Sequence, residues 1–264
     1  MRSEAAAQHA HLWRSLSWGG FYGFVLAAWA GIFLMSASLP GGLLANVSQP
    51  GFWAAICTAA GEANPLALFA MWALMSAAMM APTLVPALAT WDDMTATGAA
   101  TGSGFVALIA GYMAVWLGFS AAGAAAQGWL SSQGLVSVNG ASLSWWLTAA
   151  LLLAAGAYQF SRLKEACLSK CRRPLMFFMQ HWKPGALAAA GMGVRLGVVC
   201  MACCWALMAL GFIGGTMNLV WMGLATAFMV LEKLPDIGRW LTRPAGAVLI
   251  AGGVYAVARA TAIV

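Results

Sequence analysis

The sequence predicts an all-α protein, a polytopic transmembrane helical bundle with about seven spans, although six or eight are also possible. Of its 264 residues, 62% are hydrophobic and 8% are charged, whereas soluble domains are roughly 25% charged. The mean hydropathy is +0.82. Apolar runs of about 20 residues, the length that crosses a hydrocarbon layer of about 30 Å as a helix, recur along the chain. The lipid bilayer is therefore the first expected partner.

One span is expected for each long apolar run. In chain order these runs are Gly19–Ser38, Leu66–Trp91, Gly104–Gln127, Ser144–Arg162, Val194–Gly214, Met217–Lys233 and Pro244–Ala260. Pro82 lies inside the second run and is expected to kink that helix and to free a backbone carbonyl. The run from Gly51 to Ala60 is too short to cross and is expected to be interfacial or re-entrant. Residues 1–264 form a single integral membrane domain in this interpretation.

The lysines and arginines predict the orientation of the bundle. They precede the first span, crowd the basic loop 163–193 and lie in the connection after the sixth span, all on one side of a seven-span arrangement. By the positive-inside rule this side is the cytoplasm, so the N-terminus is expected to be cytoplasmic, and Arg259 is the exception. The loop is expected to contain an interfacial helix. No soluble basic face is visible, so nucleic acid is not an expected partner.

Three of the six cysteines stand within five positions, in the stretch CMACCWALM of the fifth span. Positions i, i+3 and i+4 share a helix face, so Cys200, Cys203 and Cys204 form one stripe that Met208 extends. Counted at about 1.5 Å per residue, these thiols lie near the middle of the bilayer. Cysteine also packs as a small hydrophobic residue. The spacing does not exclude a thiol–disulfide pair of Cys200 and Cys203.

The second span runs the opposite way and places three methionines on one face, at i, i+4 and i+8. Thiolates and thioethers are soft ligands that select Cu(I), and zinc competes for thiolates but needs four ligands at tetrahedral angles. Methionine is also a common gap-filler in packed cores. We predict a copper centre, with zinc, haem or iron as alternatives. Its candidate ligands are Cys200, Cys203, Cys204, Met71, Met75, Met79 and Met208.

A second cysteine pair lies in the basic loop. Cys167 and Cys171 are four residues apart, and the neighbouring cations are expected to lower the pKa of both thiols. Together with His181 they could form a cytoplasmic docking or relay site for a metal ion. The alternative is a basic amphipathic helix that lies on the anionic leaflet.

The few acidic residues are expected to lie at span ends. Glu232 lies near the end of the sixth span. It should pair with Lys233 or Arg195, guard an entry path, or extend its carboxylate to the cytoplasmic border. Asp92 and Asp93 are adjacent and are expected to mark a helix end in a short cytoplasmic turn. No pair of carboxylates is spaced for general acid–base catalysis.

Five stretches together resemble a bacterial family of predicted metal-binding integral membrane proteins of unknown function. They are MWALMSAAMMAPTLVP, YQFSRLKEACLSKCRRP, HWKPG, CMACCWALM and MNLVWMGLATAFMVLEKLP, within Met71 to Pro235. The family's Cys-x-x-Cys-Cys element corresponds to the three clustered cysteines, and its Met-rich element to Met71, Met75, Met79 and Met80. The resemblance implies a multi-pass protein of the bacterial inner (cytoplasmic) membrane that binds a metal.

Two functions are consistent with the sequence. In the first, the protein binds and hands on soft metal, most simply Cu(I), and supplies a metalloenzyme or exchanges copper with a metallochaperone. In the second, it is a subunit of a membrane-bound metal-dependent oxidoreductase or monooxygenase complex, in which Trp72, Trp205 and Trp221 line an apolar pocket. The chain has no Walker A loop, so it is not an ATP-driven pump by itself. It also lacks intramembrane histidines, which copper oxygenases and haem sites generally use.

Overall fold

The computed structural model describes residues 2–37, 64–137, 139–216 and 218–262. The predicted short run Gly51–Ala60 and Cys57 therefore lie outside the described residues. Within them the regular structure is helical, apart from one isolated bridge between Val136 and Ser142, which confirms the all-α class.

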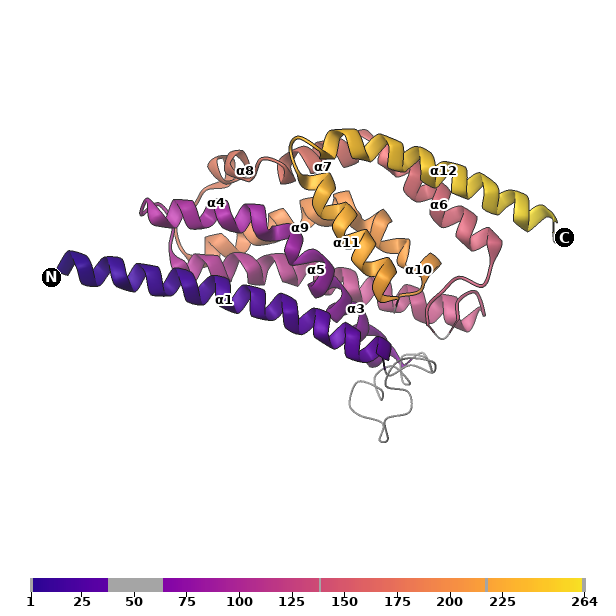
Figure 1. Ribbon diagram of the computed structural model, residues 1–264, viewed down its shortest axis with the longest axis horizontal. Coiled ribbons are helices and arrows are strands. Elements are labelled where there is room, and N and C mark those ends of the chain that lie inside the picture. The colour runs from indigo at the N-terminus through magenta and orange to yellow at the C-terminus, as the bar shows by residue number, and fades with distance from the viewer. Residues whose placement is uncertain (1, 38–63, 138, 217, 263–264) are drawn as a thin grey trace.

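Every predicted span coincides with at least one helix. The helices are α1 (Arg2–Ala37), α3 (Pro65–Met80), η1 (Pro82–Leu84), α4 (Val85–Ala96), α5 (Gly102–Ser132), α6 (Trp145–Gln159), α7 (Arg162–Cys171), α8 (Pro174–His181), α9 (Ala186–Ala209), α10 (Gly211–Gly214), α11 (Leu219–Lys233) and α12 (Gly238–Ala262). They form an elongated bundle whose two termini lie at opposite ends of its long axis (Figure 1). Opposite ends agree with an odd number of crossings.

Five helical stretches among the described residues are long and apolar enough to cross a membrane. They are Trp13–Ser36, Pro65–Ala96, Gly102–Ser132, Ala186–Gly214 and Trp240–Ala262. The helices that correspond to the other two predicted spans, α6 and α11, have 15 residues each. At about 1.5 Å per residue each is about 22 Å long, which is shorter than a hydrocarbon layer of about 30 Å. The number of spans therefore remains a prediction.

Polar side chains define where several helices begin. Asn64 precedes α3, and its side-chain oxygen accepts hydrogen bonds from the backbone N–H groups of Leu66 and Ala67. A side chain of the same kind caps each of four further helices, α5, α6, α7 and α11, by way of Thr101, Ser144, Ser161 and Asn218. Such caps satisfy backbone donors that have no partner within the helix.

Helices α5 and α9 pack with their backbones in close approach. A Cβ added at Gly111 would collide with the Ala190 carbonyl, and one added at Gly193 would collide with the Leu108 carbonyl. Small residues allow such an approach in helices that have no water between them. Tyr112 directly follows Gly111, and its backbone lies against Gly193 and Gly197 of α9.

Adding one methyl group at Gly193 should therefore destabilise the bundle. We expect Gly193→Ala to lower the free energy of unfolding by about 1–3 kcal/mol, because the backbones must separate. Gly191, two residues earlier on α9, is the matched control, since an added Cβ there meets nothing within 4 Å. Thermal unfolding in detergent measures both variants, and an equal midpoint for Gly193→Ala and Gly191→Ala would contradict the close contact.

Asp92 connects α1 and α4, and the sequence did not predict this connection. Its carboxylate lies 2.7 Å from Arg14 Nε and accepts a hydrogen bond of 3.1 Å from Trp18 Nε1. The residue is 9% exposed, so it is more than a helix-end marker. These contacts fix the first half of α1 against α4.

Candidate metal centre

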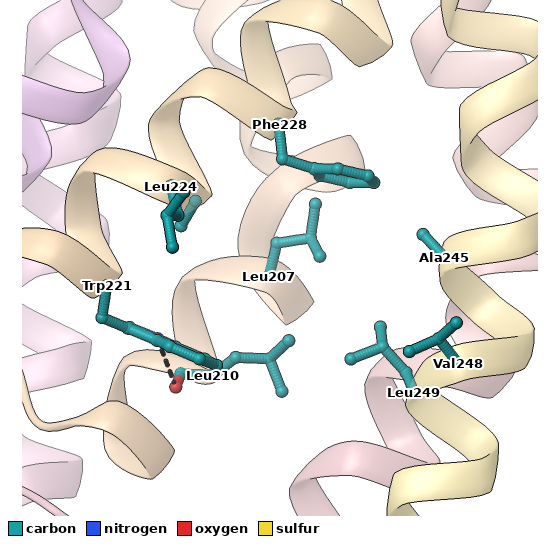
Figure 2. A pocket seen from close by; sticks show the side chains of 9 residues that line it. Leu207, Leu210, Trp221, Leu224, Phe228, Ala245, Val248 and Leu249 are labelled. Carbon is teal, nitrogen blue, oxygen red and sulfur yellow. Dashed lines mark hydrogen bonds between the residues drawn. The ribbon is translucent and has the colours of Figure 1, made fainter.

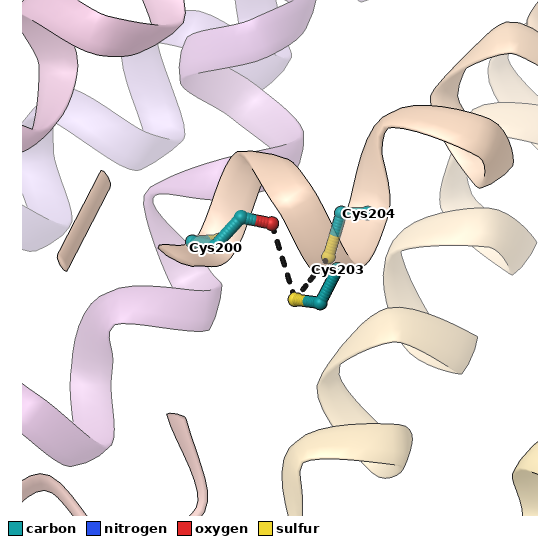
Figure 3. A group of neighbouring side chains, drawn as sticks. All are labelled: Cys200, Cys203 and Cys204. Atoms are coloured by element: carbon teal, nitrogen blue, oxygen red, sulfur yellow. Dashed lines mark hydrogen bonds between the residues drawn. The ribbon is translucent and has the colours of Figure 1, made fainter. Parts of the chain in front are cut away.

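Three cysteine side chains converge on one face of α9. The Sγ atoms of Cys200, Cys203 and Cys204 lie within 4.8 Å of one another, and all three residues are buried. Figure 3 shows Cys203 Sγ between two partners, the Cys200 carbonyl oxygen at 3.1 Å and Cys204 Sγ at 3.3 Å. Metal–sulfur bonds of about 2.3 Å, as for zinc, bridge sulfurs up to about 4.6 Å apart. The separation of the three sulfurs is close to this limit, so they form a group that could hold one metal ion.

Cys200 is surrounded by polar groups from three other elements. Lys233 Nζ, at the end of α11, donates a hydrogen bond of 2.9 Å to its Sγ. The Tyr112 hydroxyl, on α5, lies 2.9 Å from the same sulfur, and Thr83 Oγ1 lies 3.9 Å away. Lys233 is only 5% exposed, so one positive charge is buried directly beside the thiols.

The proline-induced break after α3 positions two of these groups. Helix α3 ends at Met80 and η1 begins at Pro82, where the Leu84 N–H bonds to the Ala81 carbonyl and leaves the Met80 carbonyl free. The free carbonyl accepts from Thr83 Oγ1 at 2.8 Å and from the Tyr112 hydroxyl at 3.3 Å. The predicted break at Pro82 is confirmed, and it orients both hydroxyl groups toward Cys200.

A buried ion pair lies next to Lys233. Glu232 Oε2 accepts from Lys164 Nζ at 2.9 Å, and both side chains are 1% exposed. The backbone carbonyl of Glu232 accepts from Arg172 Nε at 3.0 Å. The predicted pairing of Glu232 with Lys233 or Arg195 was wrong, because α7 folds back over the end of α11 and supplies Lys164 instead. The predicted extension of its carboxylate into solvent was also wrong, because Glu232 is buried. Both basic contacts come from the loop 163–193.

Helix α7 also carries Cys171. This residue is half-buried and packs against the core that contains the three clustered cysteines. Burial raises the pKa of the neighbouring Cys167 thiol, and the positive charge of Lys170 offsets only part of this rise. For Cys167 the expected lowering of the pKa was therefore wrong. His181 Nδ1 bonds to the Phe177 carbonyl at 2.9 Å, within its own helix.

Two methionines of α3 line a small cavity that none of the three clustered cysteines lines. Met71 and Met75 line a separate cavity of about 10 Å³, which is about the space that one water molecule needs. The cavity is otherwise lined by Ile32, Met35, Thr216 and Met222. Met79 and Met208 are buried, with 3% and 2% of their surface exposed. The role of all four predicted thioether ligands stays a prediction.

An apolar pocket of about 300 Å³ lies between α9, α11 and α12. Trp221 lines it and donates a hydrogen bond of 3.0 Å to the Leu210 carbonyl (Figure 2). The other two tryptophans of the predicted pocket lie elsewhere. Trp72 donates to Gln127 Oε1 at 2.8 Å in the core, and Trp205 packs against Tyr158 and is 41% exposed. The three indoles therefore do not form one substrate pocket.

Comparison with known proteins identifies the family. A sequence model described as "PpoB2: Copper chaperone" matches residues 69–256, more than two thirds of the chain. The chain belongs to the PpoB2 copper chaperone family. The match includes the three clustered cysteines, Cys171 and Lys233. No curated protein and no solved structure matches the chain. Membership in a copper chaperone family supports the choice of copper among the metals that the sequence left open.

Proposed function

We propose that this PpoB2 family member is a membrane-embedded protein that binds one Cu(I) ion at Cys200, Cys203 and Cys204 and passes it to a metalloenzyme. The observation that carries the proposal is the buried thiol cluster with a buried ammonium beside it. Copper is the cargo in this account. The handling of copper follows from the family, whereas the residues, the membrane and the recipient are inferred.

Ligand type and charge both favour Cu(I). Thiolates are soft donors, which Cu(I) prefers. One Cu(I), two thiolates and the Lys233 ammonium add up to zero net charge, and a buried site with zero net charge avoids the desolvation cost of an unpaired ion. Zinc with three thiolates and Lys233 would also be neutral, but structural zinc sites need a fourth closed ligand at tetrahedral angles. Cu(I) needs no such closed tetrahedral set, and the family match names copper.

Membrane embedding rests on helix length and composition. Five helical stretches have the length and hydropathy to cross, and the two ends of the described chain lie at opposite ends of the bundle. Combined with the distribution of lysine and arginine, this supports an inner-membrane protein with a cytoplasmic N-terminus. A buried position also shields Cu(I) and the thiols from water and from oxidants.

Metal analysis tests the proposal. Protein purified in detergent and loaded with Cu(I) under anaerobic conditions should hold about one copper per chain, and the triple variant Cys200→Ser, Cys203→Ser, Cys204→Ser should hold almost none, because a hydroxyl is a hard, weak donor to Cu(I). Cys167→Ser is the matched control and should keep its copper. Equal copper in the wild type and the triple variant would refute the assignment.

The oxidoreductase or monooxygenase subunit is the second candidate. Its supporting observation is the apolar pocket beside Trp221, whose lining residue Leu207 is also on α9. Trp72 and Trp205 do not line this pocket, and their separation from it weakens the second candidate. Co-purification separates the two: a stoichiometric complex with an electron-transfer or oxygenase subunit favours the second candidate, and an isolated protein that loads a recipient with copper favours the first.

A further inference from the structure

Methionine side chains from three helices line one small cavity. Met71 and Met75 come from α3, Met35 from the end of α1 and Met222 from the start of α11, and these helices pack against one another. All four residues are at most 3% exposed. The cavity measures about 10 Å³, about the space of one water molecule, so the side chains that line it surround a single small volume.

The lining of this cavity is poorly suited to water. A buried water molecule needs about two to four polar partners, and a thioether sulfur is only a weak acceptor. Among the described residues that line the cavity, Thr216 alone carries a hydroxyl, and this hydroxyl already donates to the Asn139 carbonyl at 3.3 Å. The other lining residue, Ile32, is apolar. The lining therefore favours a soft guest over a water molecule.

Thioether chemistry defines which guest this is. Thioethers are soft, uncharged donors, which prefer Cu(I) to hard cations. Methionine has three rotatable side-chain bonds and a polarisable sulfur, so the sulfur can turn toward an ion while the helix backbone stays in place. A thiol must lose its proton before it binds a metal ion, whereas a thioether has no proton to lose.

We propose that Met71, Met75 and Met222, together with Met35, form a second Cu(I) site that is separate from the cysteine centre. The inference goes beyond the proposed function, because it needs none of the three clustered cysteines. Met222 and Lys233 lie near opposite ends of α11, about 16 Å apart at about 1.5 Å per residue, and Lys233 contacts Cys200. The two groups of sulfurs therefore lie at different levels of the bundle.

Charge makes the second site weaker than the cysteine centre. Thioethers are neutral, so a Cu(I) ion bound by them keeps its positive charge in a buried position, which costs free energy. Thiolates cancel that charge at the cysteine centre. Copper on the methionines should therefore exchange rapidly and be lost on desalting, whereas copper on the cysteines is retained.

Copper uptake at equilibrium tests the proposal. The triple cysteine-to-serine variant is dialysed without oxygen against Cu(I) supplied as its acetonitrile complex. It should bind about one copper per chain while Cu(I) is present and lose it on desalting. Leucine has nearly the volume of methionine but no sulfur, so three added substitutions should abolish this uptake: Met71→Leu, Met75→Leu and Met222→Leu. Met192→Leu, at a residue of α9 that is also 3% exposed, is the comparison and should leave the uptake unchanged.

Selenomethionine labelling gives a second measurement, which needs no methionine substitution. At the copper edge, the labelled triple cysteine variant should show selenium neighbours of copper while Cu(I) is present. A copper shell without selenium overturns the inference. Unchanged uptake in the three-leucine variant also overturns it, and so does an equal loss in Met192→Leu. Failure of the proposed function is a separate result, namely a wild-type protein that retains no copper after desalting, whatever the methionines bind.

Discussion

Glu232→Gln is expected to lower the free energy of unfolding by about 3–5 kcal/mol, because it leaves the Lys164 ammonium buried without a counter-charge. Lys164 and Glu232 are both 1% exposed at their side chains and 2.9 Å apart, so water cannot replace the lost partner. Thermal or chemical unfolding in detergent measures the loss. Copper uptake should fall as well, since the pair attaches α7 to α11 beside the thiol cluster.

Two further variants distinguish the buried pair from a general charge effect. Glu165→Gln removes a carboxylate that is 62% exposed and lies 3.5 Å from Arg172, so it should cost less than about 1 kcal/mol. Lys164→Met combined with Glu232→Leu removes both charges and should recover much of the stability lost in Glu232→Gln. Similar losses for Glu165→Gln and Glu232→Gln would show that the buried pair does not hold the two helices together.

Lys233→Met is expected to weaken Cu(I) binding by about 10- to 100-fold, the range found when a residue that supports metal ligands is replaced. The methionine keeps much of the side-chain length but removes the ammonium that lies 2.9 Å from Cys200 Sγ. Metal-bound thiolates would then carry an uncompensated negative charge in a buried site. Competition with a Cu(I) chelator of known affinity measures the change.

The stability of the metal-free variant separates this role from a structural one. Removing a buried ammonium whose contact is a cysteine sulfur should leave the free energy of unfolding unchanged or raise it, because the desolvation cost of the charge disappears. Lys183→Met, at an exposed position of the same basic region, is the control and should bind copper like the wild type. Lys233→Met with full copper affinity would show that the ammonium does not support the centre.

Helix positions and the thiol cluster could be predicted because both depend on local sequence. Long apolar runs set the spans, and the spacing of Cys200, Cys203 and Cys204 places them on one helix face whatever the neighbouring helices are. The break at Pro82 followed from the missing N–H of proline. The predicted bounds differ from the helix ends. The predicted span Ser144–Arg162 extends past both ends of α6, whereas α5 and α12 extend past both ends of their predicted spans.

The surroundings of the cluster could not be predicted, because they come from residues far apart in the chain. Lys233 lies 33 positions from Cys200, and Lys164 lies 68 positions from Glu232. Hydrophobic periodicity shows which residues share a face but not which helix that face meets. The methionines illustrate this limit: Met71 and Met75 share a face as predicted, yet the cavity that they line contains methionines of α1 and α11 and none of the cysteines.

One signal in the sequence could have identified part of the missing site. Glu232 and Lys233 are adjacent charged residues at the end of an apolar run, and ionisable residues near the membrane interior are rarely without partners. Tyr112 carries no comparable signal, since it reaches Cys200 only through the close packing of α5 on α9.

X-ray absorption at the copper edge, on anaerobically loaded protein, tests the central claim most directly, because it reports the oxidation state and the ligand atoms together. The account predicts a Cu(I) edge and a first shell made of sulfur alone, from two or three donors, that disappears when Cys200, Cys203 and Cys204 are replaced by serine. A first shell dominated by nitrogen or oxygen, or the same spectrum from the triple variant, would contradict it.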